Sequence, residues 1–89
     1  MKSYVYILES LKNKSYYIGC SKDIEKRLKQ HNNGQVKATK YKRPYCLVFS
    51  QEYLNIDLAH KVELKIKSWK RKDFIEKIIR EKKIKYTGQ

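Results

Sequence analysis

The chain has 89 residues and a formal net charge of +13, because 22 lysines and arginines face 9 aspartates and glutamates. A chain of this length has room for one small core, so we expect a single domain over residues 1–89, with a core over about 3–80 and a basic tail over 81–89. No apolar run is long enough to span a bilayer and no signal-peptide core is present, so we expect a cytoplasmic protein. The positive charge indicates an anionic partner, first of all nucleic acid. An anionic membrane surface and a lysine-rich surface without a partner are the alternatives.

Cys20 and Cys46 do not have the spacing of a metal site. Each lies at or in an expected strand, where a free cysteine is usually a small buried residue. We therefore expect two reduced core cysteines, and a disulfide between them is the alternative.

Two segments rich in aromatic and β-branched residues open the chain. Residues 3–8 read SYVYIL and residues 15–20 read SYYIGC, with a polar turn between them. The pattern predicts two antiparallel strands joined as a hairpin. Gly19 would weaken the second strand, so its presence indicates close approach by a ligand or another backbone.

A helix is expected next, capped by Ser21 and ended by Gly34. Ile24 and Leu28 define its inward face, and Arg27 and His31 fall on or beside that face. A basic loop should then cover residues 35–44.

The second half of the chain predicts one strand and two helices. The strand is expected over residues 45–50, with its apolar residues 47–49 in the core. The first helix should begin at Asn55 or Asp57 and place Glu63 at the edge of its apolar face, and the second should begin near Asp73. Beyond Arg80 the chain is lysine-rich and is expected to fray. The elements together predict an α+β fold, a small three-stranded antiparallel sheet flanked by helices.

Five polar side chains fall on or beside apolar faces, which suggests that they converge on a site. They are Tyr6, Tyr17, Arg27, His31 and Glu63.

The same residues carry a resemblance to a known family. Val5-Tyr6-Ile7 and Tyr17-Ile18-Gly19 resemble the paired tripeptides of the GIY-YIG nuclease domain, although the first departs from the name at its glycine position. The helix that carries Arg27 and His31 and the segment 59–69 that carries Glu63 resemble the same family. The likeness extends from Ser3 to about Ile79. It is greatest to a small single-domain bacterial group related to structure-specific nucleases and to the nuclease module of the excision-repair protein UvrC.

The resemblance implies a metal-dependent DNA endonuclease that acts on branched, damaged or irregular DNA in repair or recombination. Glu63 would hold a divalent metal, Mg²⁺ or Mn²⁺. Arg27 would bind the phosphate with its fork of donors. Tyr6 would activate the attacking water, with nearby cations lowering its pKa, and Tyr17 would position the water or phosphate, although these two roles could be exchanged. His31 would accept or relay the proton.

Each of these residues also has a structural interpretation. The tyrosines could be ordinary sheet residues, His31 could complement the helix dipole, Arg27 could cover Leu28, and Glu63 could pair with Lys67. Four basic residues of the loop are expected to contact phosphates, with plain solvation as the alternative: Lys37, Lys40, Lys42 and Arg43.

Two other functions are open from the sequence. One is a catalytically silent nucleic-acid-binding module that acts with a partner protein. The other is an RNA-associated protein in which Tyr41, Tyr45 and Arg43 stack on or clamp single strands. Larger members of this family usually carry an attached specificity domain; we expect none here, so a protein partner could supply specificity. The sequence shows no dimer face.

Overall fold

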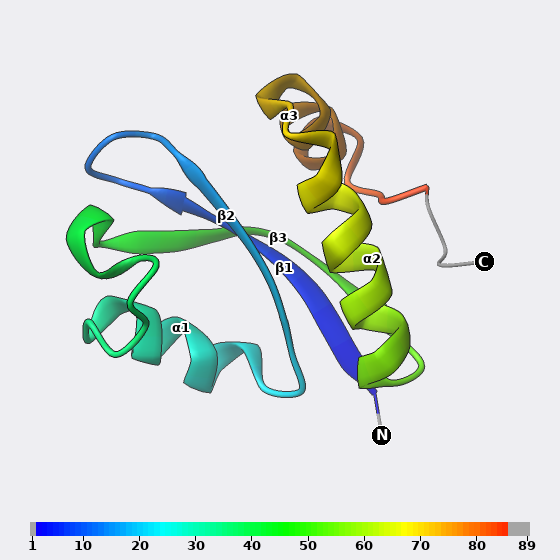
Figure 1. Cartoon of the computed structure of the whole chain (residues 1–89), viewed down its shortest axis with the longest axis horizontal. Coiled ribbons are helices and arrows are strands. Elements are labelled where there is room, and N and C mark those ends of the chain that lie inside the picture. The colour runs from blue at the N-terminus through cyan, green and yellow to red at the C-terminus, as the bar shows by residue number, and fades with distance from the viewer. Residues whose placement is uncertain (1, 86–89) are drawn as a thin grey trace.

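The computed structural model describes residues 2–85 and contains one antiparallel sheet with helices on both faces. The strands β1 (Ser3–Ser10), β2 (Tyr16–Ser21) and β3 (Tyr45–Tyr53) lie in the order β2-β1-β3. Helix α1 (Ile24–Asn32) lies on one side of the sheet, and α2 (Ile56–Trp69) and α3 (Lys72–Glu81) lie on the other (Figure 1). A short 3₁₀ helix, η1 (Lys40–Lys42), interrupts the loop before β3. The predicted α+β fold is therefore confirmed.

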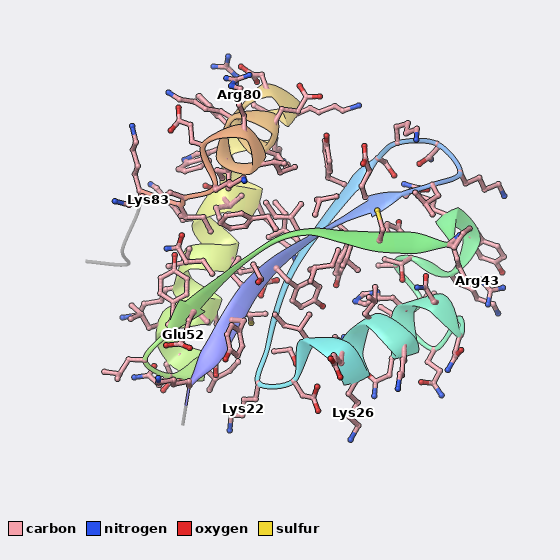
Figure 2. The ribbon with its side chains drawn as sticks, turned by 180° about the vertical axis from the view of Figure 1, so that it is seen from behind. Lys22, Lys26, Arg43, Glu52, Arg80 and Lys83 are labelled. Atoms are coloured by element: carbon pink, nitrogen blue, oxygen red, sulfur yellow. The ribbon has the colours of Figure 1, made fainter. Side chains whose placement is uncertain are left out.

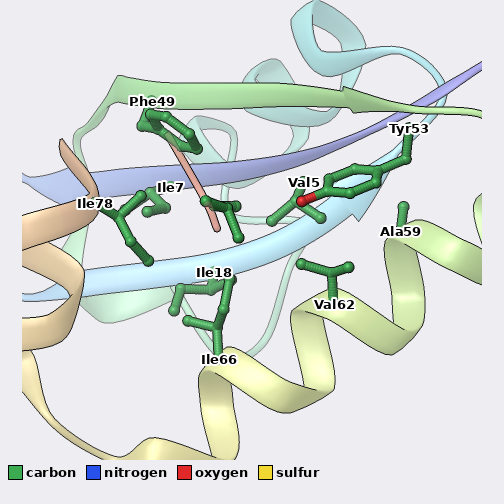
Figure 3. Packing of buried hydrophobic residues seen from close by; sticks show 10 residues of the cluster. Val5, Ile7, Ile18, Phe49, Tyr53, Ala59, Val62, Ile66 and Ile78 are labelled. Atoms are coloured by element: carbon green, nitrogen blue, oxygen red, sulfur yellow. The ribbon is translucent and has the colours of Figure 1, made fainter. Parts of the chain in front are cut away.

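The central strand β1 separates two apolar clusters. Val5 and Ile7 face α2 and belong to the larger cluster, which Figure 3 shows, whereas Tyr6 and Leu8 face α1 and belong to the smaller one. All four side chains are buried. Alternate residues of a strand point to opposite faces, so a central strand covered on both sides is apolar at every position. This explains the continuous VYIL run.

A bulge in β3 changes which of its residues face the core. Ile7 pairs with Phe49 but Leu8 pairs with Leu47, so Val48 is the extra residue. Tyr45 consequently packs in the α1 cluster and Phe49 in the α2 cluster. Leu47 is 41% exposed. The prediction that Leu47 is a core residue is therefore wrong, because the bulge interrupts the simple alternation.

The cap of α1 also differs from the expectation. Asp23, not Ser21, is the N-cap, and its carboxylate accepts a hydrogen bond of 3.1 Å from the Lys26 backbone N–H. Ser21 ends β2, and its hydroxyl accepts from the Asp23 N–H at 3.0 Å. Ser21 thus shapes the turn that leads into the helix.

The ordered core continues beyond the point where the sequence predicted fraying. Ile84 is 2% exposed, and the Gln51 side chain accepts from its N–H at 2.8 Å and donates to its carbonyl at 3.3 Å. The prediction that the chain frays after Arg80 is therefore wrong for the residues up to Ile84. The remainder of the expected tail, residues 86–89, lies outside the described residues.

The structure also bears on the expectations for the two cysteines and for a membrane-spanning segment. Cys20 and Cys46 are free thiols, and both are half-buried rather than fully buried. Within residues 2–85, no helix has the length and apolar character needed to cross a bilayer.

Candidate functional site

A chain of buried hydrogen bonds connects β1, α1 and the loop that follows α1. The Tyr6 hydroxyl lies 3.0 Å from His31 Nε2, and His31 Nδ1 lies 2.8 Å from Thr39 Oγ1. The Thr39 hydroxyl donates to the Val36 carbonyl at 3.3 Å. Since Thr39 gives its proton to Val36, it accepts from Nδ1–H of His31, and Nε2 then accepts the Tyr6 proton. The chain of bonds assigns the histidine tautomer.

Gly19 makes room for the Tyr6 ring. The two residues are cross-strand partners, and a Cβ on residue 19 would lie 2.5 Å from Tyr6 Oη. The close approach that the sequence predicted is therefore made by a side chain, not by a ligand or another backbone.

Tyr17 lies on the same face as Tyr6 and packs edge-on against His31. Its ring centroid is 4.8 Å from that of His31 and 6.5 Å from that of Tyr6. Tyr45 is 4% exposed, and its ring centroid lies 6.4 Å from that of His31. Because Tyr45 is buried in this cluster, it cannot stack on a single strand, and the RNA-binding alternative loses one of its residues.

Burial sets the ionisation of Tyr6 and His31. It raises the pKa of Tyr6 to about 12, although the neighbouring Arg27 acts in the opposite direction. Burial, together with the Arg27 charge, lowers the pKa of His31 to about 4. The expectation that cations lower the pKa of Tyr6 below its usual value is wrong, because desolvation outweighs them. At neutral pH the pair is a hydroxyl donor and a neutral imidazole acceptor.

Arg27 lies at the edge of this cluster, as its helical position predicted. Its side chain is half-buried, and Nη1 donates to Gln30 Oε1 at 2.8 Å. Hydrogen bonding by Arg27 and its positive charge both act to lower the pKa of Tyr6, so the guanidinium lies near enough to favour the phenolate form. Arg27 thus has a defined position beside Tyr6 and is more than an apolar cover for Leu28.

Glu63 forms a second polar group on α2. Its side chain is only 10% exposed, and Lys67 Nζ lies 2.6 Å from Oε2 while His60 Nδ1 lies 3.5 Å from Oε1. Burial would raise the pKa of Glu63, but hydrogen bonds from Cys20, Lys67 and His60 outweigh it and hold that pKa below its usual range. The anticipated Glu63–Lys67 pair exists, but it is nearly buried and is not an ordinary surface bridge.

Lys67 joins the two groups. Its Nζ lies 5.4 Å from the centroid of the Tyr17 ring while it holds the Glu63 carboxylate. The Glu63 charge in turn contributes to the raised pKa of Tyr6. The structure therefore brings Tyr6, Tyr17 and His31 into direct contact, with Arg27 beside them, and connects Glu63 to them through Lys67.

Cys20, Thr39 and His60 have no site role predicted from the sequence, and Lys67 was expected only as an ion-pair partner of Glu63. His60 and Lys67 share one side of α2 with Glu63, and this i, i+3 and i+7 spacing is a signal that the sequence does contain. For Cys20 the sequence indicates only a place in the core. Thr39 gives no signal, because nothing local in the loop sequence shows that it reaches His31.

The donors around Glu63 are suited to a divalent cation. Cys20 Sγ, His60 Nδ1 and a Glu63 oxygen all lie within 4.8 Å of one another. A carboxylate is the hard oxygen ligand that Mg²⁺ takes, with water completing its shell, whereas thiolate and imidazole suit zinc-like ions. Any cation would compete with Lys67 for the carboxylate.

The loop predicted to contact phosphates is exposed. All four of its basic side chains are exposed, and the Arg43 guanidinium lies over Gly34, where a Cβ would be 2.5 Å from Nη1 (Figure 2 labels Arg43). The same loop supplies Thr39 to the buried hydrogen-bond chain. Phosphate contact by this loop stays a prediction.

Comparisons with known proteins agree on one family. The model of the GIY-YIG catalytic domain matches residues 2–89. A UPF0213 protein of Staphylococcus saprophyticus is 45% identical over 71 residues, which cover 79% of this chain and 85% of that protein. A UPF0213 protein of Syntrophus aciditrophicus is 39% identical over 79 residues, which cover 86% of this chain and 90% of that protein. The solution NMR structure of a UPF0213 protein from Bacillus halodurans superimposes with a TM-score of 0.59 at 32% identity and covers 99% of this chain and 93% of that one. The chain therefore belongs to the GIY-YIG catalytic domain family.

Proposed function

We propose that this protein is a metal-dependent endonuclease that hydrolyses phosphodiester bonds in branched, damaged or irregular DNA during repair or recombination. Membership of the GIY-YIG catalytic domain family implies nuclease-type activity. The observation that carries the proposal is the buried Tyr6–His31–Thr39 chain of hydrogen bonds, which begins beside Arg27. A buried tyrosine and histidine with strongly shifted pKa values are typical of a functional site.

In this proposal Arg27 binds the phosphate next to the cleaved bond. The guanidinium fork suits two phosphate oxygens, and its charge stabilises the extra negative charge of the transition state. Binding also changes the neighbouring histidine. The Arg27 charge contributes to the low pKa of His31, so an anion at Arg27 offsets that effect and raises the pKa of His31.

Because the raised pKa lets His31 accept a proton more readily, Tyr6 can pass its own proton to His31. As the attacking water gives a proton to the Tyr6 oxygen, the Tyr6 proton moves to His31 Nε2, to which it already donates. Nδ1 stays bound to Thr39, which fixes the ring. Tyr17, against His31 and under Lys67, positions the water or the phosphate.

Glu63 is the proposed metal ligand. Mg²⁺ or Mn²⁺ there would neutralise the phosphate and the leaving oxygen as a Lewis acid. Lys67 keeps the buried carboxylate ionised, as a cation ligand must be.

A catalytically silent nucleic-acid-binding module, acting with a partner protein, is the second candidate. The 2.6 Å Glu63–Lys67 ion pair favours it, because Lys67 occupies the carboxylate that a metal would need.

Nicking of supercoiled plasmid and of a branched duplex, with Mg²⁺, with Mn²⁺ and with EDTA, separates the two candidates. We expect metal-dependent cleavage that is lost in Glu63→Gln, Arg27→Ala and Tyr6→Phe. The matched controls are Glu25→Gln and Lys26→Ala, which alter exposed residues of α1 and should cleave normally.

Cleavage that survives Glu63→Gln and Arg27→Ala would contradict the proposed site. Salt-sensitive DNA binding without cleavage in any metal would instead support the silent module.

A further inference from the structure

A cavity of about 410 Å³ opens where β2 meets the junction of α2 and α3. Its volume falls in the range of about 300–1,000 Å³ that is typical of small-ligand sites. Tyr17 and Lys67 line it, so it adjoins the candidate site directly. None of the roles proposed above uses the rest of this cavity.

The floor of the cavity is apolar and aromatic. Ile18, Ile66 and Ile75 line it together with the half-buried ring of Tyr16. Such a floor accepts a flat ring system, because aromatic side chains stack on nucleobases of any sequence.

The rim of the cavity is basic. Lys70, Arg71 and Lys72 follow one another at the turn between α2 and α3 and line the opening. Arg71 is already held by Asp73 at 2.7 Å and lies over the Phe74 ring at 4.3 Å. Lys72 Nζ lies over the Tyr16 ring, 5.6 Å from its centroid, so a positive charge is placed beside the aromatic floor. The rim therefore favours an occupant that carries a phosphate beside a flat apolar ring.

We propose that this cavity receives one unpaired nucleotide of the DNA substrate, next to the phosphate that Arg27 binds. The base lies on Tyr16 and the isoleucines, and Lys70 and Lys72 contact its phosphate. Taking a base out of a duplex costs a few kcal/mol and costs least where the base is already unpaired. The cavity thus gives a physical reason for a preference for irregular DNA. The position of the nucleotide relative to cleavage rests on the proposed function, but the binding itself does not.

Binding in EDTA tests the cavity without cleavage. The probe is a DNA duplex with a single bulged 2-aminopurine, compared with the same duplex fully paired. We expect the bulged probe to bind about 5- to 150-fold more tightly, the span that stacking of one base on an aromatic side chain gives, and its fluorescence to be quenched on binding. Equal affinity for the two probes, or no quenching, would overturn the proposal.

Two variants locate the base. Tyr16→Leu should remove most of the preference for the bulge, and its matched control Tyr4→Leu, at another half-buried tyrosine of the sheet, should keep it. Lys70→Asn with Lys72→Asn should weaken binding of the bulged probe more than Lys26→Asn with Lys29→Asn. Asparagine suits residue 70 because Lys70 has φ 50°. A preference that survives both cavity variants would contradict the assignment, and this second variant remains informative if Tyr16→Leu is unstable.

The results also separate this proposal from the proposed function. Bulge preference without metal-dependent cleavage would support the cavity and contradict the nuclease. Cleavage unaffected by Tyr16→Leu, on paired and bulged DNA alike, would support the nuclease and contradict the cavity. A stronger preference for a bulge in RNA than in DNA would overturn the choice of DNA.

Discussion

His31 is held neutral inside the protein, and this makes the stability of the fold depend on pH. The side chain is fully buried between Tyr6 and Thr39, and each ring nitrogen has one hydrogen-bond partner. Protonation would place a second donor opposite the Tyr6 hydroxyl proton and a charge beside Arg27. The folded protein therefore resists a proton that the unfolded chain accepts readily.

We predict that the protein loses stability as the pH falls from about 7 towards 4. The pKa of His31 is about 4 in the folded state and about 6.5 in an unfolded chain. Between these values the unfolded state binds more protons, so the free energy of unfolding rises with pH and falls on acidification. Urea denaturation at pH 7.5 and pH 5 measures the difference, and His31→Gln should reduce it. An equal pH dependence in His31→Gln would show that other groups cause it.

Gly19→Ala should destabilise the fold and disturb the candidate site together. The new methyl group would lie 2.5 Å from Tyr6 Oη, so the Tyr6 ring must move away from His31. Overpacking of this kind costs about 1–3 kcal/mol. Urea denaturation of Gly19→Ala, of Tyr6→Leu and of the double variant checks the cause. Because Tyr6→Leu removes the colliding ring, the two changes should combine to less than their sum, and strict additivity would contradict the explanation.

At the scale of elements, the last turn of the chain that the structure describes closes the main core. After α3 the backbone turns at Lys82, which has φ 57°, and Ile84 inserts into the cluster formed by the sheet and α2. Gln51 of β3 holds both backbone groups of Ile84. A segment of mostly lysines thus contributes one apolar anchor to the fold.

Ile84→Ala should therefore lower the free energy of unfolding by about 2–5 kcal/mol, the usual cost of emptying a buried isoleucine site. Its matched control is Lys85→Ala, which removes an exposed side chain 3.7 Å from Glu81 and should cost about 1 kcal/mol or less. Thermal or urea unfolding measures both. Similar losses for the two variants would show that the segment does not pack as described.

At the scale of the whole molecule, the net charge of +13 is spread over separate regions. The basic loop that contains η1 lies near the end of α1, while the basic turn between α2 and α3 lies on the other face of the sheet. In Figure 2, Arg43 lies at one end of the molecule and Arg80 and Lys83 lie at another. Net charge alone would attract DNA to all of these regions, so only directed substitutions can tell which of them bind it.

We predict that the loop contributes strongly to the salt dependence of DNA binding. If its four basic residues bind phosphates, their replacement by serine should reduce the slope of log K against log salt by about 0.9 for each phosphate that is no longer neutralised. The matched control removes the same charge from other exposed positions, Lys2, Lys77, Arg80 and Lys83, and should change the slope less. Fluorescence anisotropy with a paired duplex, titrated at low and at high salt, measures both slopes. Equal effects would mean that binding follows net charge and not this loop.

The sequence by itself determined the features that depend on local periodicity. Strand alternation placed Tyr6 and Tyr17 on or beside apolar faces, and helical spacing placed Arg27 and His31 beside the apolar face of α1, because side-chain direction follows directly from backbone repeat. The order of strands and helices then favoured a three-stranded antiparallel sheet flanked by helices. These expectations agree with the structure.

Only the tertiary structure decided what depends on contacts between distant segments. Thr39 meets His31 across a loop, Lys67 connects Glu63 to Tyr17, and Ile84 reaches the core through Gln51. The raised pKa of Tyr6 likewise follows from burial, which no stretch of sequence displays. The physical reason is the same in each case: periodicity tells which way a side chain points, but its partners and its exposure to water are set only when separate elements pack together.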